Sequence, residues 1–90
     1  MPVAVHISPR HMSKADYERL IAELRAAGAE EPPGRRFHAG YGDDEVRMFE
    51  VWDSAEDFHA HRDDLFEALR CVGLDGGTVE LHALHSPRPD

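Results

Sequence analysis

Histidine is the residue type that stands out as a potential source of chemistry, with seven copies among 90 residues. His59 and His61 are two residues apart on a predicted helix, which places their side chains roughly 200° apart around its axis. His82 and His85 are three apart on a predicted strand, so they point to opposite faces. The sequence contains no HExxH motif and no zinc-finger spacing. We therefore expect no metal site.

His61 has the most informative position among these histidines. It lies three residues after Phe58 and four before Leu65, on the helix stripe that should face the sheet. In one interpretation it is a core side chain, hydrogen-bonded to a backbone carbonyl or a tyrosine. In the other it is a neutral imidazole that lines a cavity and acts as a base or a haem ligand. The sequence leaves both open.

A second group of ionisable residues lies on the predicted strands. His6, His38, Glu50 and His82 share one strand phase, and the predicted strand order 4-1-3-2 would bring them together. A carboxylate beside imidazoles could support general-base chemistry, with His38 as the leading candidate. Alternatively, the group is a polar layer between two sheets, on the face opposite the helices. A strand bulge would instead turn these side chains towards the helices.

Aromatic and basic residues complete the candidate site. Trp52 has an apolar body and one N–H donor, so it is either a packing anchor or a surface for a ligand. Tyr17 and Tyr41 could be core residues or could line a pocket. Arg36 and Arg47 lie at strand positions from which they could pair with an acidic ligand or with glutamates of neighbouring strands, Glu50 and Glu80.

These residues are placed by six predicted elements in the order βαββαβ. Alternating apolar residues predict strands over 3–7, 35–41, 46–52 and 78–84, and N-caps at Ser13 and Ser54 begin two helices that end near Gly28 and Gly73. We expect residues 86–90 to form a loose tail. The order predicts one ferredoxin-like α+β domain over residues 1–90, with a four-stranded antiparallel sheet and two helices on one face. The other face is half apolar, which predicts a homodimer.

Composition excludes several other classes of function. The formal net charge of −8 disfavours nucleic acid and anionic membranes as partners, because both require a cationic face. No apolar run is long enough to span a membrane, and the N-terminus lacks a signal-peptide pattern. The single cysteine, Cys71, fits a reducing compartment. We therefore expect a cytoplasmic protein.

The corner Val51-Trp52-Asp53-Ser54-Ala55-Glu56-Asp57-Phe58 connects the third strand to the second helix. It resembles the V-W-[DE]-S-x-E-x-F corner of antibiotic biosynthesis monooxygenase-like proteins, within the dimeric α/β-barrel superfamily. The resemblance implies two sheets that join into a barrel, with a ligand cavity between sheet and helices. Characterised members of the superfamily include cofactor-free oxygenases of aromatic polyketide-type substrates and haem-degrading enzymes.

The resemblance also bears on single side chains. Haem degraders ligate iron through a histidine of the second helix and place a tryptophan at the end of strand three. Trp52 matches the latter position, and His61 lies on the former helix, although Arg62 could occupy the matching place instead. Oxygenase and haem-degrading members typically place an asparagine near the cavity, whereas this chain contains no Asn or Gln.

Two hypotheses of different classes follow. In the first, the protein is a cofactor-independent monooxygenase whose cavity holds a hydrophobic or aromatic molecule, with His38 or His61 as the base. Oxygen chemistry without a cofactor needs a substrate that forms a stabilised carbanion, so the protein supplies a base and electrostatic holding. In the second, the same homodimer binds a small molecule without catalysis. Haem binding or degradation is a third hypothesis. The expected ligand-binding residues are His6, Tyr17, Tyr41, Glu50, Trp52 and His82.

Overall fold

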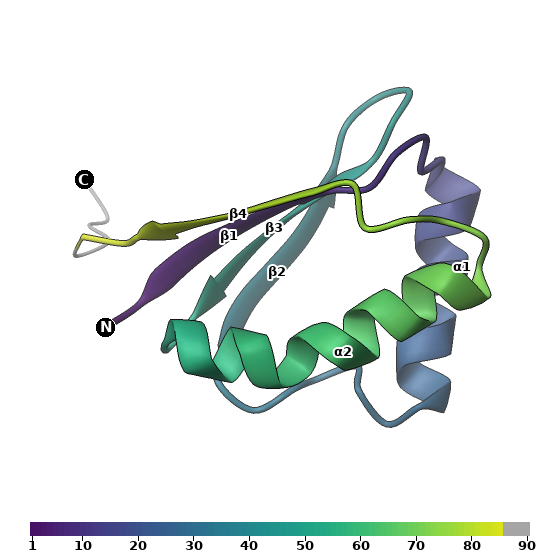
Figure 1. Ribbon diagram of the computed structural model, residues 1–90. Helices are drawn as coiled ribbons and strands as arrows, with labels where there is room; N and C mark the ends of the chain where they lie inside the picture. Colours follow the sequence, from purple (N-terminus) through teal and green to yellow (C-terminus); the bar gives the residue numbers. More distant parts are fainter. Residues whose placement is uncertain (86–90) are drawn as a thin grey trace.

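Four antiparallel strands form one sheet in the order β2-β3-β1-β4, with both helices on one side of it (Figure 1). The computed structural model describes residues 1–85. Its elements are β1 (Val3–Ser8), α1 (Lys14–Ala26), β2 (Arg35–Tyr41), β3 (Arg47–Trp52), α2 (Ala55–Cys71) and β4 (Thr78–Ala83). The predicted ferredoxin-like fold is confirmed, whereas the predicted tail 86–90 lies outside the described residues. Within residues 1–85, neither helix is long and apolar enough to cross a bilayer.

Both helices begin at the predicted serine caps, but the two caps differ. At α1, Ser13 and Asp16 form a reciprocal capping box, each side chain accepting a 3.1 Å hydrogen bond from the other's backbone N–H. At α2, Ser54 Oγ accepts from the Asp57 N–H at 3.1 Å, and no return bond from Asp57 is present among the described residues. Asp57 lies instead against Gly34, where an added Cβ would be 2.6 Å from its carboxyl carbon. The N-terminus of α2 therefore has a serine cap without the reciprocal bond of a capping box.

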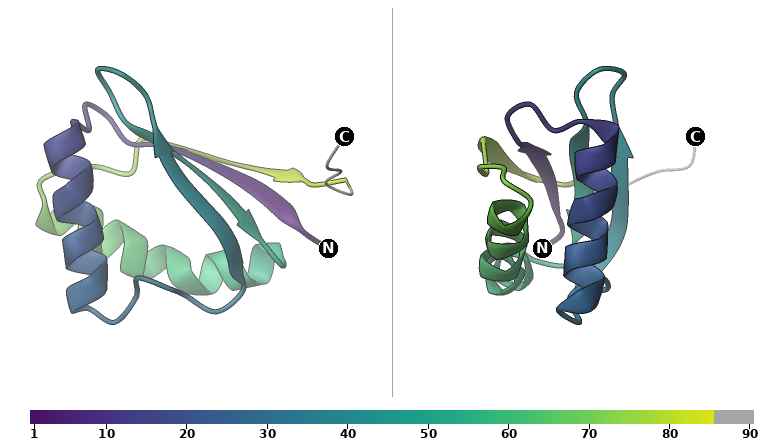
Figure 2. Two further views of the ribbon diagram at one scale, coloured as in Figure 1. Left: turned by 180° about the vertical axis from the view of Figure 1, so that it is seen from behind. Right: turned by 90° about the vertical axis from the view of Figure 1, so that its right-hand side faces the viewer.

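The core lies between the sheet and the two helices, which cross the same face of the sheet (Figure 2). One phase of each inner strand points into it, including the fully buried side chains of Ile7 and Trp52. The helices contribute an apolar stripe at helical spacing that buries Leu20, Phe58 and Leu65. This layer fixes which strand residues can meet the helices.

The opposite face of the sheet is uncovered in this chain. Phe37 and Tyr41 of β2 are 51% and 45% exposed there, and Phe49 lies between Phe37 and His6, with ring centroids 6.1 Å and 5.0 Å apart. His82 also lies on this face, 6.2 Å from His6. A single antiparallel sheet with exposed aromatic side chains is a typical surface for association.

The predicted cluster of His6, His38, Glu50 and His82 is confirmed only in part, because the register divides it into a His38–Glu50 pair on one face and a His6–His82 pair on the other. His6 pairs with Phe49, whereas Glu50 pairs with Val5 on one side and His38 on the other. His38 and Glu50 therefore face the helices. The phase of β3 was ambiguous because both of its faces carry large apolar residues, and the expected orientation towards the open face is corrected.

Candidate functional site

A bulge at the start of β2 brings Arg35 to the side of the sheet that faces the helices, where His38 also lies. Arg35 pairs with Trp52 and Phe37 with the adjacent Val51, so Arg36 is an extra residue in the ladder. Successive strand residues otherwise alternate between faces. The extra residue therefore places Arg35 on the same side of the sheet as His38.

Glu50 is the centre of the resulting polar group. It is 1% exposed, yet both of its carboxylate oxygens have partners. Oε2 accepts from Nδ1 of His38 at 2.6 Å and from Nη1 of Arg35 at 3.4 Å, and Oε1 accepts from Nε1 of Trp52 at 2.8 Å. A buried carboxylate is tolerated when it is paired and hydrogen-bonded in this way.

The charge state of Glu50 fixes the orientation of the histidine proton. Burial alone raises the pKa of Glu50, but hydrogen bonds from His38 and Trp52 and the positive charges of His38 and Arg35 outweigh it, so the pKa is lowered. The carboxylate is thus ionised near neutral pH and can only accept hydrogen bonds. Nδ1 of His38 must therefore donate to this carboxylate, and in the neutral form of the ring Nε2 is then the acceptor.

Nε2 of His38 lies 2.6 Å from the hydroxyl oxygen of Tyr17, a residue of α1. Burial raises the pKa of Tyr17, the charge of Arg35 lowers it, and that of Glu50 raises it, with a net increase. The phenol therefore keeps its proton near neutral pH and donates to Nε2. The Tyr17 ring reaches this position because Gly40 has no side chain, since an added Cβ there would be 2.6 Å from Cζ of Tyr17.

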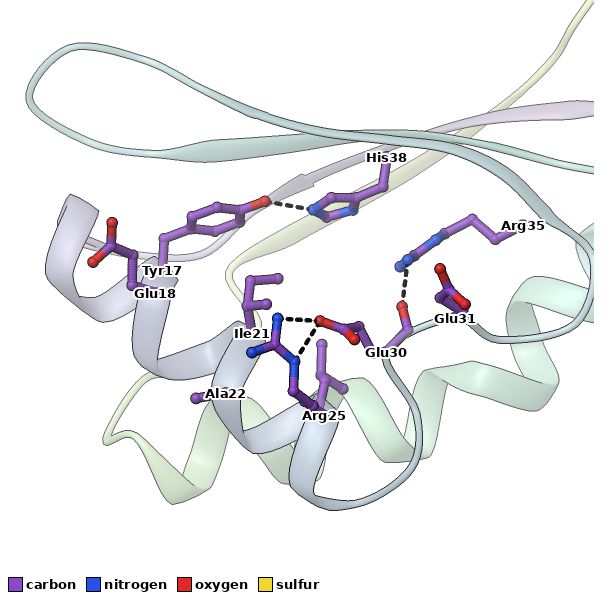
Figure 3. A pocket seen from close by; sticks show the side chains of 10 residues that line it. Tyr17, Glu18, Ile21, Ala22, Arg25, Glu30, Glu31, Arg35 and His38 are labelled. Atoms are coloured by element: carbon purple, nitrogen blue, oxygen red, sulfur yellow. Dashed lines mark hydrogen bonds and ion pairs between the residues drawn. The ribbon is translucent and has the colours of Figure 1, made fainter.

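Tyr17 and His38 border a hollow of about 660 Å³ between α1 and β2, which we call the α1–β2 hollow (Figure 3). Its volume lies within the range of about 300–1,000 Å³ that is typical of small-molecule sites. Ile21 and Leu24 supply apolar surface, whereas Arg35 and a pair formed by Arg25 and Glu30 supply charge. The hollow thus combines apolar walls with a few oriented polar groups.

Arg35 is the site residue that the alternation of β2 did not reveal. It donates to the carbonyl of Glu30 at 2.5 Å in addition to Glu50, and both bonds hold its guanidinium beside the hollow. Of the partners that the sequence left open for Arg36, Glu50 is excluded, because Arg36 points away and forms an exposed pair with Asp53. Only the bulge distinguishes the two arginines, and the sequence carried no separate signal for it.

His61, on α2, contacts the Trp52 ring but makes no hydrogen bond to Glu50. It is 4% exposed, its ring centroid is 5.4 Å from that of Trp52, and its Nε2 has no partner among residues 1–85. The expected hydrogen bond of a core histidine is therefore absent at this atom. Burial lowers the pKa of His61, and the charge of Glu50 only partly opposes this, so the imidazole is neutral near pH 7.

The surroundings of His61 do not suit haem. The hollow that it borders encloses about 200 Å³, less than an ordinary ligand pocket and too small for a porphyrin. It is lined by prolines and alanines of the α1–β2 connection and by Asp57 and Asp64 of α2. His61 does not border the α1–β2 hollow, so it is not placed to share a ligand with His38.

The structure thus divides the predicted site residues into separate groups. Tyr17, His38, Glu50 and Trp52 form one connected group, in which fully buried Trp52 serves as a donor and packing residue. His61 borders the smaller hollow beside α2, and three others lie with Arg47 and Glu80 around a shallow hollow on the open face of the sheet: His6, Tyr41 and His82. In the described part of the chain, no three His, Cys, Asp or Glu residues are grouped to hold a metal ion.

Comparison with known families agrees with this architecture. The sequence profile described as antibiotic biosynthesis monooxygenase matches residues 3–65, from β1 into α2. The chain belongs to this family. The resemblance indicated by the Val51–Phe58 corner is therefore confirmed. A comparison with curated proteins found no match.

Solved structures show the same fold. A candidate antibiotic biosynthesis monooxygenase from Chloroflexus aurantiacus J-10-fl is 21% identical, with 96% of each chain covered and a TM-score of 0.64. A second candidate of this kind, from Deinococcus radiodurans, is 14% identical, with 100% of this chain and 98% of that chain covered and a TM-score of 0.65. Rv0793 from Mycobacterium tuberculosis is 25% identical, with 98% and 97% covered and a TM-score of 0.58.

Proposed function

We propose that this protein binds a hydrophobic or aromatic small molecule in the α1–β2 hollow and oxidises it as a cofactor-independent monooxygenase. The observation that carries the proposal is the aligned chain from Tyr17 through His38 to Glu50 at the wall of that hollow. A buried carboxylate that orients an imidazole, which in turn accepts from a hydroxyl, is the arrangement of a proton relay.

The relay removes a proton from an acidic C–H group of the substrate. The Tyr17 oxygen takes this proton while its own proton passes to Nε2 of His38, 2.6 Å away. The imidazolium that forms is stabilised by the ionised carboxylate of Glu50. His38 is thus the proton acceptor, and the choice between His38 and His61 as base is made in favour of His38.

The guanidinium of Arg35 stabilises the anion that deprotonation leaves on the substrate. Arg35 borders the hollow and is held in place by Glu30 and Glu50, so its charge is preorganised. The carbanion then reacts with dioxygen. A methylene carbon loses two hydrogens and becomes a carbonyl with one oxygen atom, and the other oxygen atom leaves as water, so no external reductant is needed.

The activity is tested with an anthrone-type substrate, by oxygen uptake and quinone formation. His38→Ala and Tyr17→Phe should each lower kcat by about 100-fold or more, the usual contribution of a positioned acid or base. His59→Ala is the matched control, because His59 is exposed on α2. Unchanged turnover in His38→Ala would refute the proposed base.

A non-catalytic binding protein is the second candidate, and the absence of Asn and Gln from the chain favours it. Under this alternative, the native protein binds anthrone with a shift in the Tyr17 and His38 resonances but consumes no oxygen. Loss of binding in Gly40→Leu would place the ligand beside Tyr17 in either case, because that substitution displaces the tyrosine ring.

We also propose that the protein is a homodimer joined through the open face of the sheet. The exposed aromatic side chains of Phe37 and Tyr41 support this, because large apolar side chains on an uncovered sheet favour burial against a second sheet. Sedimentation at micromolar concentration should give a dimer for the native chain and a monomer for Phe37→Glu. A folded native monomer at that concentration would contradict the proposal.

A further inference from the structure

We propose that a second hollow, between α2 and β4, binds a small organic anion through Arg10 and Arg62. This α2–β4 hollow measures about 670 Å³, and the side chains of Arg70, Phe66 and Leu74 also border it. β2 and β4 are the two opposite edges of the sheet, so the α2–β4 hollow is separate from the α1–β2 hollow. The proposal does not depend on the monooxygenase activity.

The first argument is the distribution of positive charge. The chain has 18 acidic and only 10 basic residues, yet three arginines border this one hollow. Arg70 pairs with Glu67, but no ion pair between described residues involves Arg10 or Arg62. Two cations without an ion-pair partner among the described residues therefore border one hollow of a protein whose net charge is negative.

The second argument is that the backbone beside Arg10 and the guanidinium of Arg62 are held in place. Arg10 follows β1 in a loop whose next residues are fixed, because Met12 is fully buried and its carbonyl accepts from the Val46 N–H at 2.8 Å. The guanidinium of Arg62 lies 4.9 Å from the centre of the Phe66 ring, a cation–π contact that orients it. Preoriented side chains lose less entropy when a ligand binds.

The loop before β4 keeps the hollow open. An added Cβ on Gly76 would lie 3.1 Å from the Phe66 ring, and one on Gly77 would lie 2.0 Å from the Ser8 carbonyl oxygen, so this loop packs closely without side chains. Asp75 is the acidic residue of the lining, and its carboxylate accepts from the Gly77 N–H at 2.8 Å. That carboxylate is thus engaged by its own loop.

The chemistry of the lining defines the ligand class. Guanidinium groups bind carboxylate and phosphate oxygens through paired, charge-assisted hydrogen bonds. Phe66, Leu74 and Val79 add partly buried apolar surface beside them. The hollow therefore suits a carboxylate or phosphate carried on an apolar or aromatic body, and a neutral analogue of the same shape should not bind.

The test is a ¹H–¹⁵N NMR titration of the full chain with benzoate, phenyl phosphate and neutral benzamide. We expect shifts in the Nε–Hε signals of Arg10 and Arg62 and in the Gly76 and Gly77 amides with both anions. Tighter binding of benzoate would indicate a carboxylate site, and tighter binding of phenyl phosphate would indicate a phosphate site. Equal shifts with benzamide, or shifts spread over the whole surface, would overturn the proposal.

Two substitutions locate the site independently of the NMR titration. Arg10→Gln and Arg62→Gln should each weaken binding of the preferred anion about tenfold, as expected for loss of one charged hydrogen-bond partner. Both side chains are exposed, so the fold should persist. The matched control is Arg19→Gln on α1, whose partner is Asp16. Affinities that are the same in all three variants would exclude this hollow.

Discussion

Glu50 and His61 are both buried and both contact Trp52, but they differ in how far their polar atoms are hydrogen-bonded. Both oxygens of Glu50 accept hydrogen bonds, from His38, Arg35 and Trp52, whereas Nε2 of His61 has no partner in the described chain. Glu50 receives donors from the bulged edge strand and from its own strand. His61 enters from α2, where it packs on the Trp52 ring and borders a hollow that Asp57 and Asp64 also line.

The difference follows from the cost of burial in each charge state. An ionised carboxylate cannot be buried without partners, so its neighbours must be arranged around it. An imidazole can remain neutral, and the cost of one unpaired nitrogen is then of the order of 1–3 kcal/mol. Glu50 is thus a fixed structural centre of the candidate site, whereas His61 retains an unused proton acceptor.

The largest effect is expected when the charge of Glu50 is removed. Glu50→Gln leaves Arg35 and His38 without their counter-ion and should lower the free energy of unfolding by roughly 3 kcal/mol. Urea denaturation measures this change. The control is Glu23→Gln on α1, which is exposed and should change stability by less than about 0.5 kcal/mol. Similar losses in the free energy of unfolding for the two variants would show that the partners of Glu50 add no measurable stability.

Trp52 contacts both residues, so its truncation tests how they are connected. Trp52→Phe keeps an aromatic ring beside His61 but removes the donor to Oε1 of Glu50. We expect a loss of about 2 kcal/mol from the cavity and the missing hydrogen bond together. In the Glu50→Gln background the same substitution should cost measurably less, and strict additivity in this double-mutant cycle would argue against coupling.

The two residues should also give separate pH dependences of stability. Both pKa values are lowered on folding, so the unfolded chain binds more protons and stability falls as the pH falls. As the pH falls, the loss of stability begins near pH 6.5 for His61 and near pH 4.5 for Glu50, which are the ordinary pKa values of these groups. It continues down to the lowered pKa of each group in the folded protein. Each slope is at most about 1.4 kcal/mol per pH unit. His61→Leu should abolish the upper window alone.

The smallest effect is expected from His61 at a pH where it is neutral. At pH 7.5, His61→Leu replaces an unpaired polar ring by an apolar side chain of similar size and should raise the free energy of unfolding by about 1 kcal/mol. His59→Leu, on the exposed side of α2, serves as the comparison. If His61→Leu instead lowered stability by more than 2 kcal/mol, Nε2 would have a partner in solution.

The elements were predictable because their signals are local. β2 has the predicted bounds, and Ser13 and Ser54 begin the helices as their capping patterns indicate. The antiparallel order of the strands followed from the βαββαβ sequence. In the candidate site, the approach of Glu50 to His38 was predictable from the strand order, whereas the contacts of Tyr17 and Trp52 with this pair were not.

The contacts depend on features that alternation does not encode. β3 has apolar residues on both faces, so its phase could not be read, and this error placed Glu50 on the wrong side of the sheet. The bulge that selects Arg35 over Arg36 depends on pairing with β3. Likewise, the role of Gly40 is visible only when the Tyr17 ring is seen beside it.

The bulge has a further consequence for tolerance of length changes in the edge strand. It separates two consecutive arginines, of which Arg35 now faces Glu50 and Arg36 faces outward to Asp53. A deletion near residue 34, or loss of the bulge, would shift the start of β2 by one position in its pairing with β3. Arg36 would then face the helices in place of Arg35. The doubled arginine therefore gives the buried carboxylate a reserve counter-ion against a one-residue slip of the chain.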